Sequence, residues 1–263
     1  MTYTEIHGAG LRYELTGKGE RTIVLVHEMG GTMESWDEVA PRLATSRRVL
    51  RYDTRGAGMS SKVRGRLTID TMADDIAGLL DVAGIKGKVA LAGIAVGGAI
   101  ALHFAARYPD RASAVVVGSP ATSIEADRVS AVLARVAEIE TAGMAFAVDG
   151  SMQNGYPLEL RDKTDRFATY RARWLGNDPA SYATIYRMLA ATDLTDELTH
   201  LTCPVLVIGG ELDKSRPAAI SEATAKTIPG ARYKLLRTGH YMAAHTPELI
   251  ADTISEFLKS VDA

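Results

Sequence analysis

Short apolar runs alternate with helical patterns along most of the chain, and this rhythm predicts an α/β fold. Four runs are almost continuously apolar, as strands buried on both faces of a parallel sheet are: residues 22–27, 89–93, 113–118 and 204–210. Apolar residues recur at helical spacing over 72–80 and 250–258. Thr246 followed by Pro247 predicts the start of the last helix.

Two regions depart from this rhythm. Residues 3–7 and 11–15 alternate polar and apolar positions around Gly-Ala-Gly, which predicts two antiparallel strands. Over residues 123–193 the alternation stops, and helical patterns are interrupted by polar stretches. We interpret 123–193 as a helical cap inserted after the sixth strand, into a core formed by residues 1–122 and 194–263.

Composition narrows the function classes. The chain has 263 residues, 24% of them charged, and a net charge of -2, which favours neither nucleic acid nor an anionic membrane as a partner. No apolar run is long enough to span a bilayer, the first residues lack a signal peptide's pattern, and the single Cys203 cannot form an internal disulfide. We therefore expect a cytoplasmic protein. We also expect a small-molecule substrate, and the assembly is left open, with a homodimer among the possibilities.

The segment Leu-Ala-Gly-Ile-Ala-Val-Gly-Gly at 91–98 carries the first chemical signal. It is the G-x-S-x-G pattern of a nucleophile elbow with Ala95 in place of serine. The flanking glycines permit a sharp turn from strand to helix, and the N–H of Val96 would face an oxyanion there. The motif therefore predicts a catalytic corner whose attacking group is missing.

Residues farther along the chain complete this pattern. Asp213 and His240 each follow a strand-like run, and position 95, an acid and then a histidine is the chain order expected of a triad in this architecture. His240 would be the general base and Asp213 would orient it. Glu125 is an alternative acid, and His245 has a second claim on the pocket.

The segment Val-Leu-Val-His-Glu-Met-Gly-Gly at 24–31 ends a strand with a glycine-containing loop. This is where the architecture supplies its second oxyanion N–H, here assigned to Met29. His27 and Glu28 lie beside it and are candidates for contact with substrate. A charged Glu28 facing inward would disfavour an oxyanion, so either it points away from the pocket or it serves a substrate.

These motifs, spread from Val24 to His240, resemble those of the α/β-hydrolase family. Within it, Arg-Tyr-Asp-Thr-Arg-Gly-Ala-Gly-Met-Ser at 51–60 and the stretch 177–198 look most like β-ketoadipate enol-lactone hydrolases. The resemblance implies a mostly parallel sheet flanked by helices with a helical cap. It also implies hydrolysis of a small lactone, ester or amide in a catabolic pathway.

The cap carries the candidates for binding a substrate carboxylate. Arg161 and Arg166 are the arginines we select for a bidentate contact, and Trp174 is the candidate for stacking on a substrate ring. The sequence shows neither a cluster of metal ligands nor a phosphate-binding loop, so we expect no metal and no organic cofactor.

Three hypotheses account for Ala95. The chain is an inactivated form of a serine hydrolase, or a non-hydrolytic binding protein on a hydrolase scaffold. In the third, His240 and Asp213 activate water or deprotonate the substrate directly, with Glu28 as an extra acid or base. We favour the first because the rest of the catalytic pattern is retained.

Overall fold

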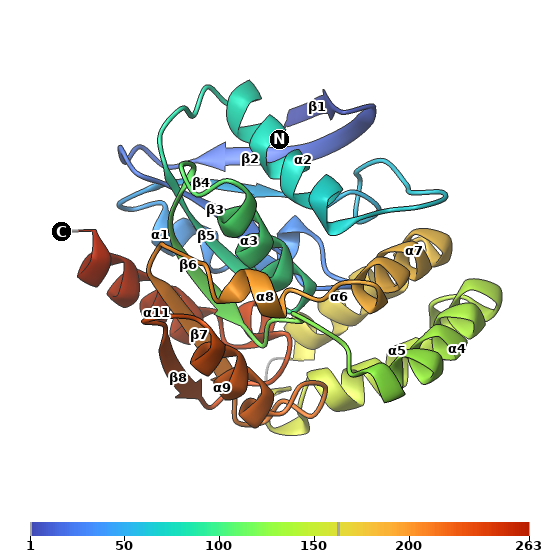
Figure 1. Ribbon diagram of the computed structural model, residues 1–263. Helices are drawn as coiled ribbons and strands as arrows, with labels where there is room; N and C mark the ends of the chain where they lie inside the picture. The colour runs from blue at the N-terminus through green and yellow to red at the C-terminus, as the bar shows by residue number, and fades with distance from the viewer. Residues whose placement is uncertain (1, 162–163, 263) are drawn as a thin grey trace.

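One sheet of eight strands forms the centre of the molecule (Figure 1). The computed structural model describes residues 2–161 and 164–262. The strand order is β1-β2-β4-β3-β5-β6-β7-β8; β1 and β2 pair antiparallel, β2 pairs antiparallel with β4, and the remaining pairs are parallel. The strands are β1 (Thr2–Ile6), β2 (Ala9–Thr16), β3 (Thr22–Val26), β4 (Arg48–Tyr52), β5 (Val89–Ile94), β6 (Ala112–Gly118), β7 (Val205–Gly210) and β8 (Arg232–Leu236).

Helices cover both faces of this sheet and connect its strands. They are η1 (Met33–Trp36), α1 (Ala40–Leu43), α2 (Ile69–Val82), α3 (Val96–Arg107), α4 (Ala126–Ala142), α5 (Ala145–Gly155), η2 (Leu158–Leu160), α6 (Thr164–Leu175), α7 (Pro179–Ala190), α8 (Thr195–Leu198), α9 (Ala218–Thr227), α10 (Met242–His245) and α11 (Pro247–Val261). The predicted mostly parallel α/β fold is confirmed, as are the antiparallel strands at the start of the chain and the last helix from Pro247.

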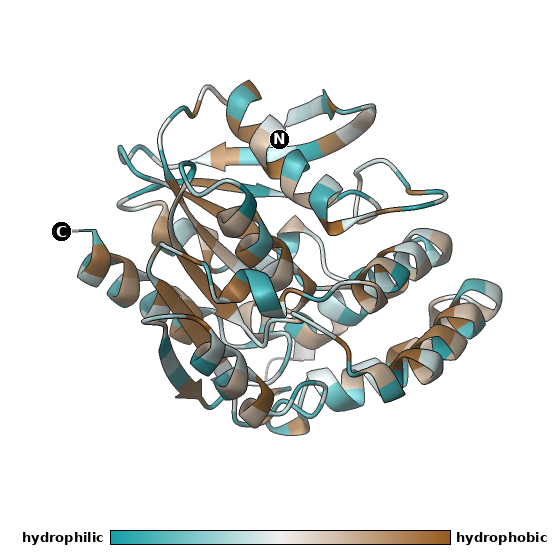
Figure 2. Cartoon of the chain, viewed as in Figure 1, coloured by the Kyte–Doolittle hydropathy of each residue, from teal (hydrophilic) through white to brown (hydrophobic). Residues whose placement is uncertain are grey.

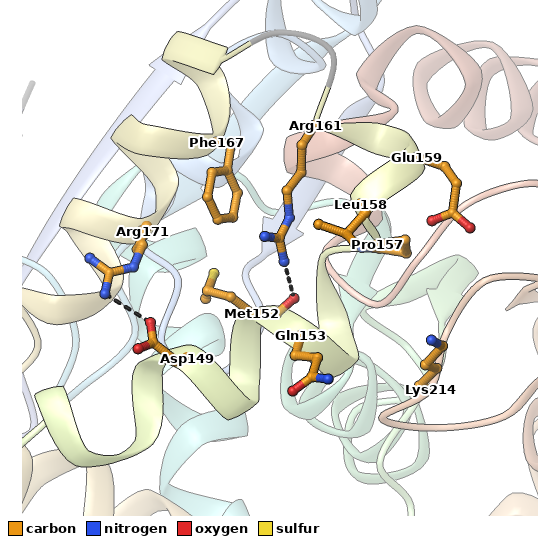
Figure 3. Close-up of a pocket in the computed structure, with 10 residues that line it drawn as sticks. All are labelled: Asp149, Met152, Gln153, Pro157, Leu158, Glu159, Arg161, Phe167, Arg171 and Lys214. Atoms are coloured by element: carbon orange, nitrogen blue, oxygen red, sulfur yellow. Dashed lines mark hydrogen bonds and ion pairs between the residues drawn. The ribbon is translucent and has the colours of Figure 1, made fainter.

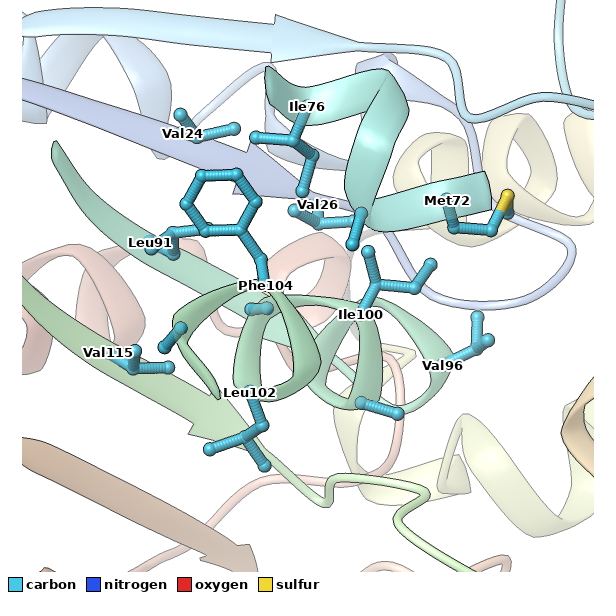
Figure 4. Packing of buried hydrophobic residues seen from close by; sticks show 14 of the residues in the cluster. Val24, Val26, Met72, Ile76, Leu91, Val96, Ile100, Leu102, Phe104 and Val115 are labelled. Carbon is cyan, nitrogen blue, oxygen red and sulfur yellow. The ribbon is translucent and has the colours of Figure 1, made fainter. Parts of the chain in front are cut away.

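The apolar runs are continuous because successive side chains of a central strand enter different cores. In β3, Val24 and Val26 pack on the face covered by α2, α3 and α9, while Ile23 and Leu25 pack on the face covered by α1 and α11. Figure 4 shows Phe104 and other side chains of α3 directed at the first face. Figure 2 shows the resulting brown strands, with more polar residues on the outer helices.

Helices α4–α7 lie outside the sheet and pack mainly on one another, with α4 against α7 and α5 against α6 (Figure 1). A third apolar cluster joins these helices to the sheet: Val148, Tyr156 and Trp174 pack there with Tyr241 and with Met29, which also contacts the core over α2 and α3. The boundaries of a cap at residues 123 and 193 remain a prediction.

Candidate active site

The turn between β5 and α3 places Ala95 at the elbow. Its backbone is strained for a residue with a side chain, with φ 51° and ψ -113°. Three hydrogen bonds hold it: the Ala95 N–H donates to Gly118 O at 2.9 Å, and Ala95 O accepts from the Ala121 N–H at 3.0 Å and the Ala99 N–H at 3.1 Å. A Cβ on Gly97 would lie 2.3 Å from Val26 O, so only glycine lets α3 begin this close to β3.

His240 and Asp213 are joined as predicted. The His240 Nδ1 and Asp213 Oδ2 atoms are 2.8 Å apart, and the His240 side chain is 14% exposed whereas that of Asp213 is fully buried. Since the carboxylate accepts, Nδ1 carries the proton and Nε2 is left as the basic atom. Glu125 instead lies exposed at the start of α4, and the buried His245 lies 3.3 Å from Thr238 Oγ1.

Asp213 is held in its charged form by its surroundings. Burial alone raises the pKa of this carboxyl, but the charge and hydrogen bond of His240 outweigh it. The Arg216 N–H bonds Asp213 Oδ1 at 2.8 Å, and Ser119 donates its hydroxyl to Oδ2 at 2.7 Å, so the net pKa is lowered. Sequence reasoning missed Ser119, whose φ of 42° marks a second strained residue at the site.

Short main-chain links bring the elbow and the His240–Asp213 pair together. Gly118 accepts the Ala95 N–H, and the next residue is the Ser119 that bonds Asp213. A Cβ on Gly118 would lie 2.7 Å from Ile94 Cδ1 and 2.3 Å from Met242 Sδ, which places the end of β5 against the segment that carries His240. The turn at Ala95 and the His240–Asp213 pair therefore both lie at the carboxyl edge of the sheet.

The loop after β3 forms a turn beside α3. The Gly31 N–H bonds Glu28 O at 3.0 Å, and Gly30 has φ 78°, the geometry of a turn with glycine at its third position. Met29 holds the second position, whose N–H takes no part in the turn's hydrogen bond. Its N–H, like that of Val96 at the first turn of α3, thus suits an oxyanion.

His27 does not face a substrate. Its Nδ1 lies 2.8 Å from Glu28 O and its Nε2 accepts from the Thr54 N–H at 3.0 Å. These two contacts require a neutral ring with the proton on Nδ1. Because both nitrogens bond main chain and the residue is buried, the prediction that His27 binds substrate is wrong; it anchors the loop.

The Glu28 carboxylate is buried and is held by two hydroxyl groups. Its Oε1 accepts the Ser35 and Tyr170 hydroxyls, each at 2.7 Å, and its Oε2 is buried without a hydrogen-bond partner among the described residues. Burial raises the pKa of the Tyr170 phenol, and the nearby Glu28 raises it further, so this phenol stays a donor. The carboxylate thus ties the loop to α6, and a contact of Glu28 with substrate stays a prediction.

Trp174 is fully buried and supports the same loop. A Cβ on Gly30 would lie 2.2 Å from Trp174 Nε1, so the indole lies flush against this glycine. Asn177, which the sequence did not single out, donates to Gly30 O at 2.8 Å. The Trp174 indole also packs edge to face with the Tyr182 ring, and the two ring centroids are 5.5 Å apart. The indole has no room for a substrate ring, which corrects the stacking prediction.

Both selected arginines already have protein partners. Arg161 donates to the carbonyls of Met152 and Tyr156 and lies over the Phe167 ring, 4.1 Å from its centroid (Figure 3). Arg166 forms an ion pair with Glu38 at the surface. Neither guanidinium is free in this structure to clamp a carboxylate, so the predicted arginine contacts are not supported.

A cavity of about 710 Å³ lies among α5, η2 and α6, with Arg161, Phe167 and Lys214 on its walls (Figure 3). The end of α5 lies between this cavity and His240. The N–H of His240 bonds Gly155 O at 2.9 Å, and a Cβ on Gly239 would lie 2.4 Å from Pro157 Cδ, so the end of α5 separates this cavity from the histidine. We therefore do not assign the reaction to it.

The described residues contain no group of three or more His, Cys, Asp or Glu side chains placed to hold a metal ion. No helix in the described part of the chain is long and apolar enough to cross a membrane.

Comparison with known proteins decides the family. Residues 17–241 match the family model described as serine aminopeptidase, S33. The chain is an α/β-hydrolase. It is 26% identical over 260 residues to 3-oxoadipate enol-lactonase 1 of Acinetobacter baylyi, covering 98% of this chain and 96% of that protein.

Two solved structures share the whole fold of this hydrolase. The enol-lactonase from Burkholderia xenovorans LB400 superposes with a TM-score of 0.93 at 28% identity, covering 98% of this chain and 100% of that one. A thermophilic esterase from Thermogutta terrifontis superposes with a TM-score of 0.91 at 28% identity, covering 100% and 98%. The resemblance to the α/β-hydrolases and to enol-lactonases is thus confirmed.

Proposed function

We propose that this chain is the scaffold of a serine hydrolase for a small, carboxylate-bearing lactone, ester or amide of a catabolic pathway. Ala95 stands where the nucleophile acts, so the chain binds its substrate without forming an acyl intermediate. The observation that carries the proposal is the His240–Asp213 pair, 2.8 Å apart, next to an alanine in the strained elbow conformation. A packing role alone requires neither feature.

The retained groups fit acyl transfer. With serine at position 95, the hydroxyl oxygen would attack the carbonyl carbon while its proton passed to His240 Nε2. The N–H groups of Met29 and Val96 would stabilise the oxyanion. Collapse would expel the leaving group, which takes the proton back from His240, and water would then release the acid by the same route. The unchanged chain, with Ala95 in place of serine, would still bind and orient the substrate.

The substrate class rests on the relatives. One is named 3-oxoadipate enol-lactonase and the solved structures include an enol-lactonase and an esterase, which all split a carbonyl–oxygen bond. All of them share this type of reaction. The carboxylate of the substrate is suggested by the name of the 3-oxoadipate enol-lactonase. A small acyl compound with a carboxylate is therefore the class we propose for this chain.

The test compares the unchanged chain with Ala95→Ser on aryl esters, lactones and short amides. We expect hydrolysis only in Ala95→Ser, and its loss in the double variant Ala95→Ser, His240→Ala. Silence of Ala95→Ser across the whole panel would contradict the proposal. Equal rates in the unchanged chain and Ala95→Ser would also contradict it, and would indicate that His240 activates water directly.

A further inference from the structure

Five arginines of the cap are occupied by other groups of the protein, whereas Arg128 and Arg135 lie exposed on α4. Arg161 binds main-chain carbonyls, and four others form ion pairs: Arg166 with Glu38, Arg171 with Asp149, Arg173 with Asp37 and Arg187 with Glu140. An arginine that already faces a carboxylate gains little from a second one. A substrate acid is therefore better served by a cation that is partly buried and not already paired with a carboxylate.

Arg216 lies beside the catalytic acid and lacks such a partner. Its main-chain N–H bonds Asp213 Oδ1, and its Nη2 donates to Ser123 O at 3.2 Å. Among the described residues no carboxylate forms an ion pair with it, and its Nε and Nη1 have no hydrogen-bond partner although they are not sealed from solvent. A half-buried guanidinium thus presents free N–H groups at the site.

The surroundings of Arg216 compensate its positive charge only in part. Burial lowers the pKa of its guanidinium, and the positive charge of Arg128 on α4 lowers it further. Asp213, Tyr186 and Glu125 act in the opposite direction without cancelling these effects. A bound carboxylate would add opposite charge next to the guanidinium and complete this compensation.

Arg216 is also close to the reacting atoms. Ser123, which accepts its Nη2, lies two residues beyond Ala121, whose N–H bonds Ala95 O. At about 3.8 Å per residue, the Ser123 Cα lies within roughly 8 Å of the Cα of Ala121, which is itself hydrogen-bonded to the elbow. A guanidinium held by Ser123 O therefore suits a carboxylate that several methylene groups separate from the carbonyl under attack.

We propose that Arg216 binds the carboxylate of the substrate. The contact would be charge-assisted, with the carboxylate oxygens accepting from the free guanidinium N–H groups while Nη2 keeps its bond to Ser123 O. This inference rests on the proposed function, since it names the residue that selects an acidic substrate. It replaces Arg161 and Arg166 in that role.

A binding experiment tests the role of Arg216 without any hydrolysis of the ligand. The probes are the mono-4-nitroanilides of succinic, glutaric and adipic acid and the methyl ester of each, titrated by calorimetry into the unchanged chain. We expect at least one free acid to bind about 10-fold to 100-fold more tightly than its methyl ester, as a hydrogen-bonded charge pair predicts. Equal binding of acid and ester, or no binding by any of the six compounds, would overturn the proposal.

Substitutions of Arg216 show whether its side chain causes the preference for the free acid over the methyl ester. Arg216→Gln should bind acid and ester equally, and Arg216→Lys should retain part of the preference because it keeps the charge without the fork. Both leave the main-chain bond to Asp213, and their thermal unfolding checks the fold. Arg187→Gln, which removes a surface ion pair of the cap, is the matched control and should keep the full preference. Preference retained in Arg216→Gln would refute the assignment.

Activity separates this inference from the proposed function. If Arg216→Gln abolishes the preference for acids but Ala95→Ser hydrolyses nothing, the anion site stands and the hydrolase proposal fails. If Ala95→Ser hydrolyses aryl half-esters and adding Arg216→Gln leaves KM unchanged, the hydrolase stands and the anion site fails. A rise in KM for half-esters, with no change for their methyl esters, would support both.

Discussion

The contact between Glu28 and Tyr170 ties the loop after β3 to α6, and its removal should lower the stability of the protein. Tyr170→Phe deletes a hydroxyl that donates to Glu28 Oε1 at 2.7 Å, where both residues are buried. A hydrogen bond to a charged acceptor is worth about 1.5–3 kcal/mol. Oε2 is already without a partner, so the carboxylate would keep only Ser35. We expect the melting temperature to fall by about 3–10 °C.

A matched contact at the surface provides the control. Tyr108 donates to Asp74 Oδ1 at 2.6 Å, nearly the same distance, but the Asp74 side chain is 30% exposed and also pairs with Arg107. Water can replace that phenol, so Tyr108→Phe should cost less than about 1 kcal/mol. Urea unfolding of the two single variants measures the difference.

A double-mutant cycle isolates the pair itself. Glu28→Leu alone leaves the Tyr170 and Ser35 hydroxyls buried and unpaired, whereas Glu28→Leu with Tyr170→Phe removes both members of one bond. The double variant should therefore be about 1–2 kcal/mol more stable than the sum of the single losses predicts. Strict additivity, together with equal costs for Tyr170→Phe and Tyr108→Phe, would refute this account of Glu28.

Three other substitutions probe the site. Ser119→Ala removes a donor from buried Asp213, so its lowered folded-state pKa should rise toward 3.8 and the loss of stability that Asp213 causes in acid should become smaller, measured by urea unfolding from pH 3 to 7. Gly97→Ala should unfold the elbow region, because its Cβ meets Val26 O, and a variant of unchanged melting temperature would contradict the packing. Burial lowers the pKa of His245 to about 3. The unfolded chain takes up that proton below about pH 6.5, so stability is complete above pH 6.5 and falls toward pH 3, a slope that His245→Asn should flatten.

Local patterns predicted the parts of the site that the backbone dictates. Strand ends are visible as limits of apolar runs, and all parallel strands present their carboxyl ends at one edge, so Asp213 and His240 had to meet near position 95. The glycines at 93 and 97 marked the turn because side chains there would strike main-chain atoms. Hydrophobic pattern and turn chemistry determine these features.

Side-chain partners were beyond the sequence because they come from distant segments. Glu28 and Tyr170 are 142 positions apart, and Ser119 and Asp213 are 94 apart. Whether a carboxylate faces a pocket or a tyrosine depends on how α6 docks, which no local pattern records. For the same reason the cap arginines were misjudged: Arg166 is neutralised by Glu38, 128 positions away.

The conformation of Ala95 shows that the elbow is imposed by its surroundings. An alanine gains nothing from φ 51° and ψ -113°, which costs on the order of 1–3 kcal/mol. It keeps them because the N–H is bound by Gly118, the carbonyl by Ala121, and α3 is pressed against β3 at Gly97. These contacts belong to the frame and not to the side chain at the apex. Exchanging alanine for serine adds one oxygen to a corner already bent for it, and for this reason Ala95→Ser is a test of chemistry with little change of fold.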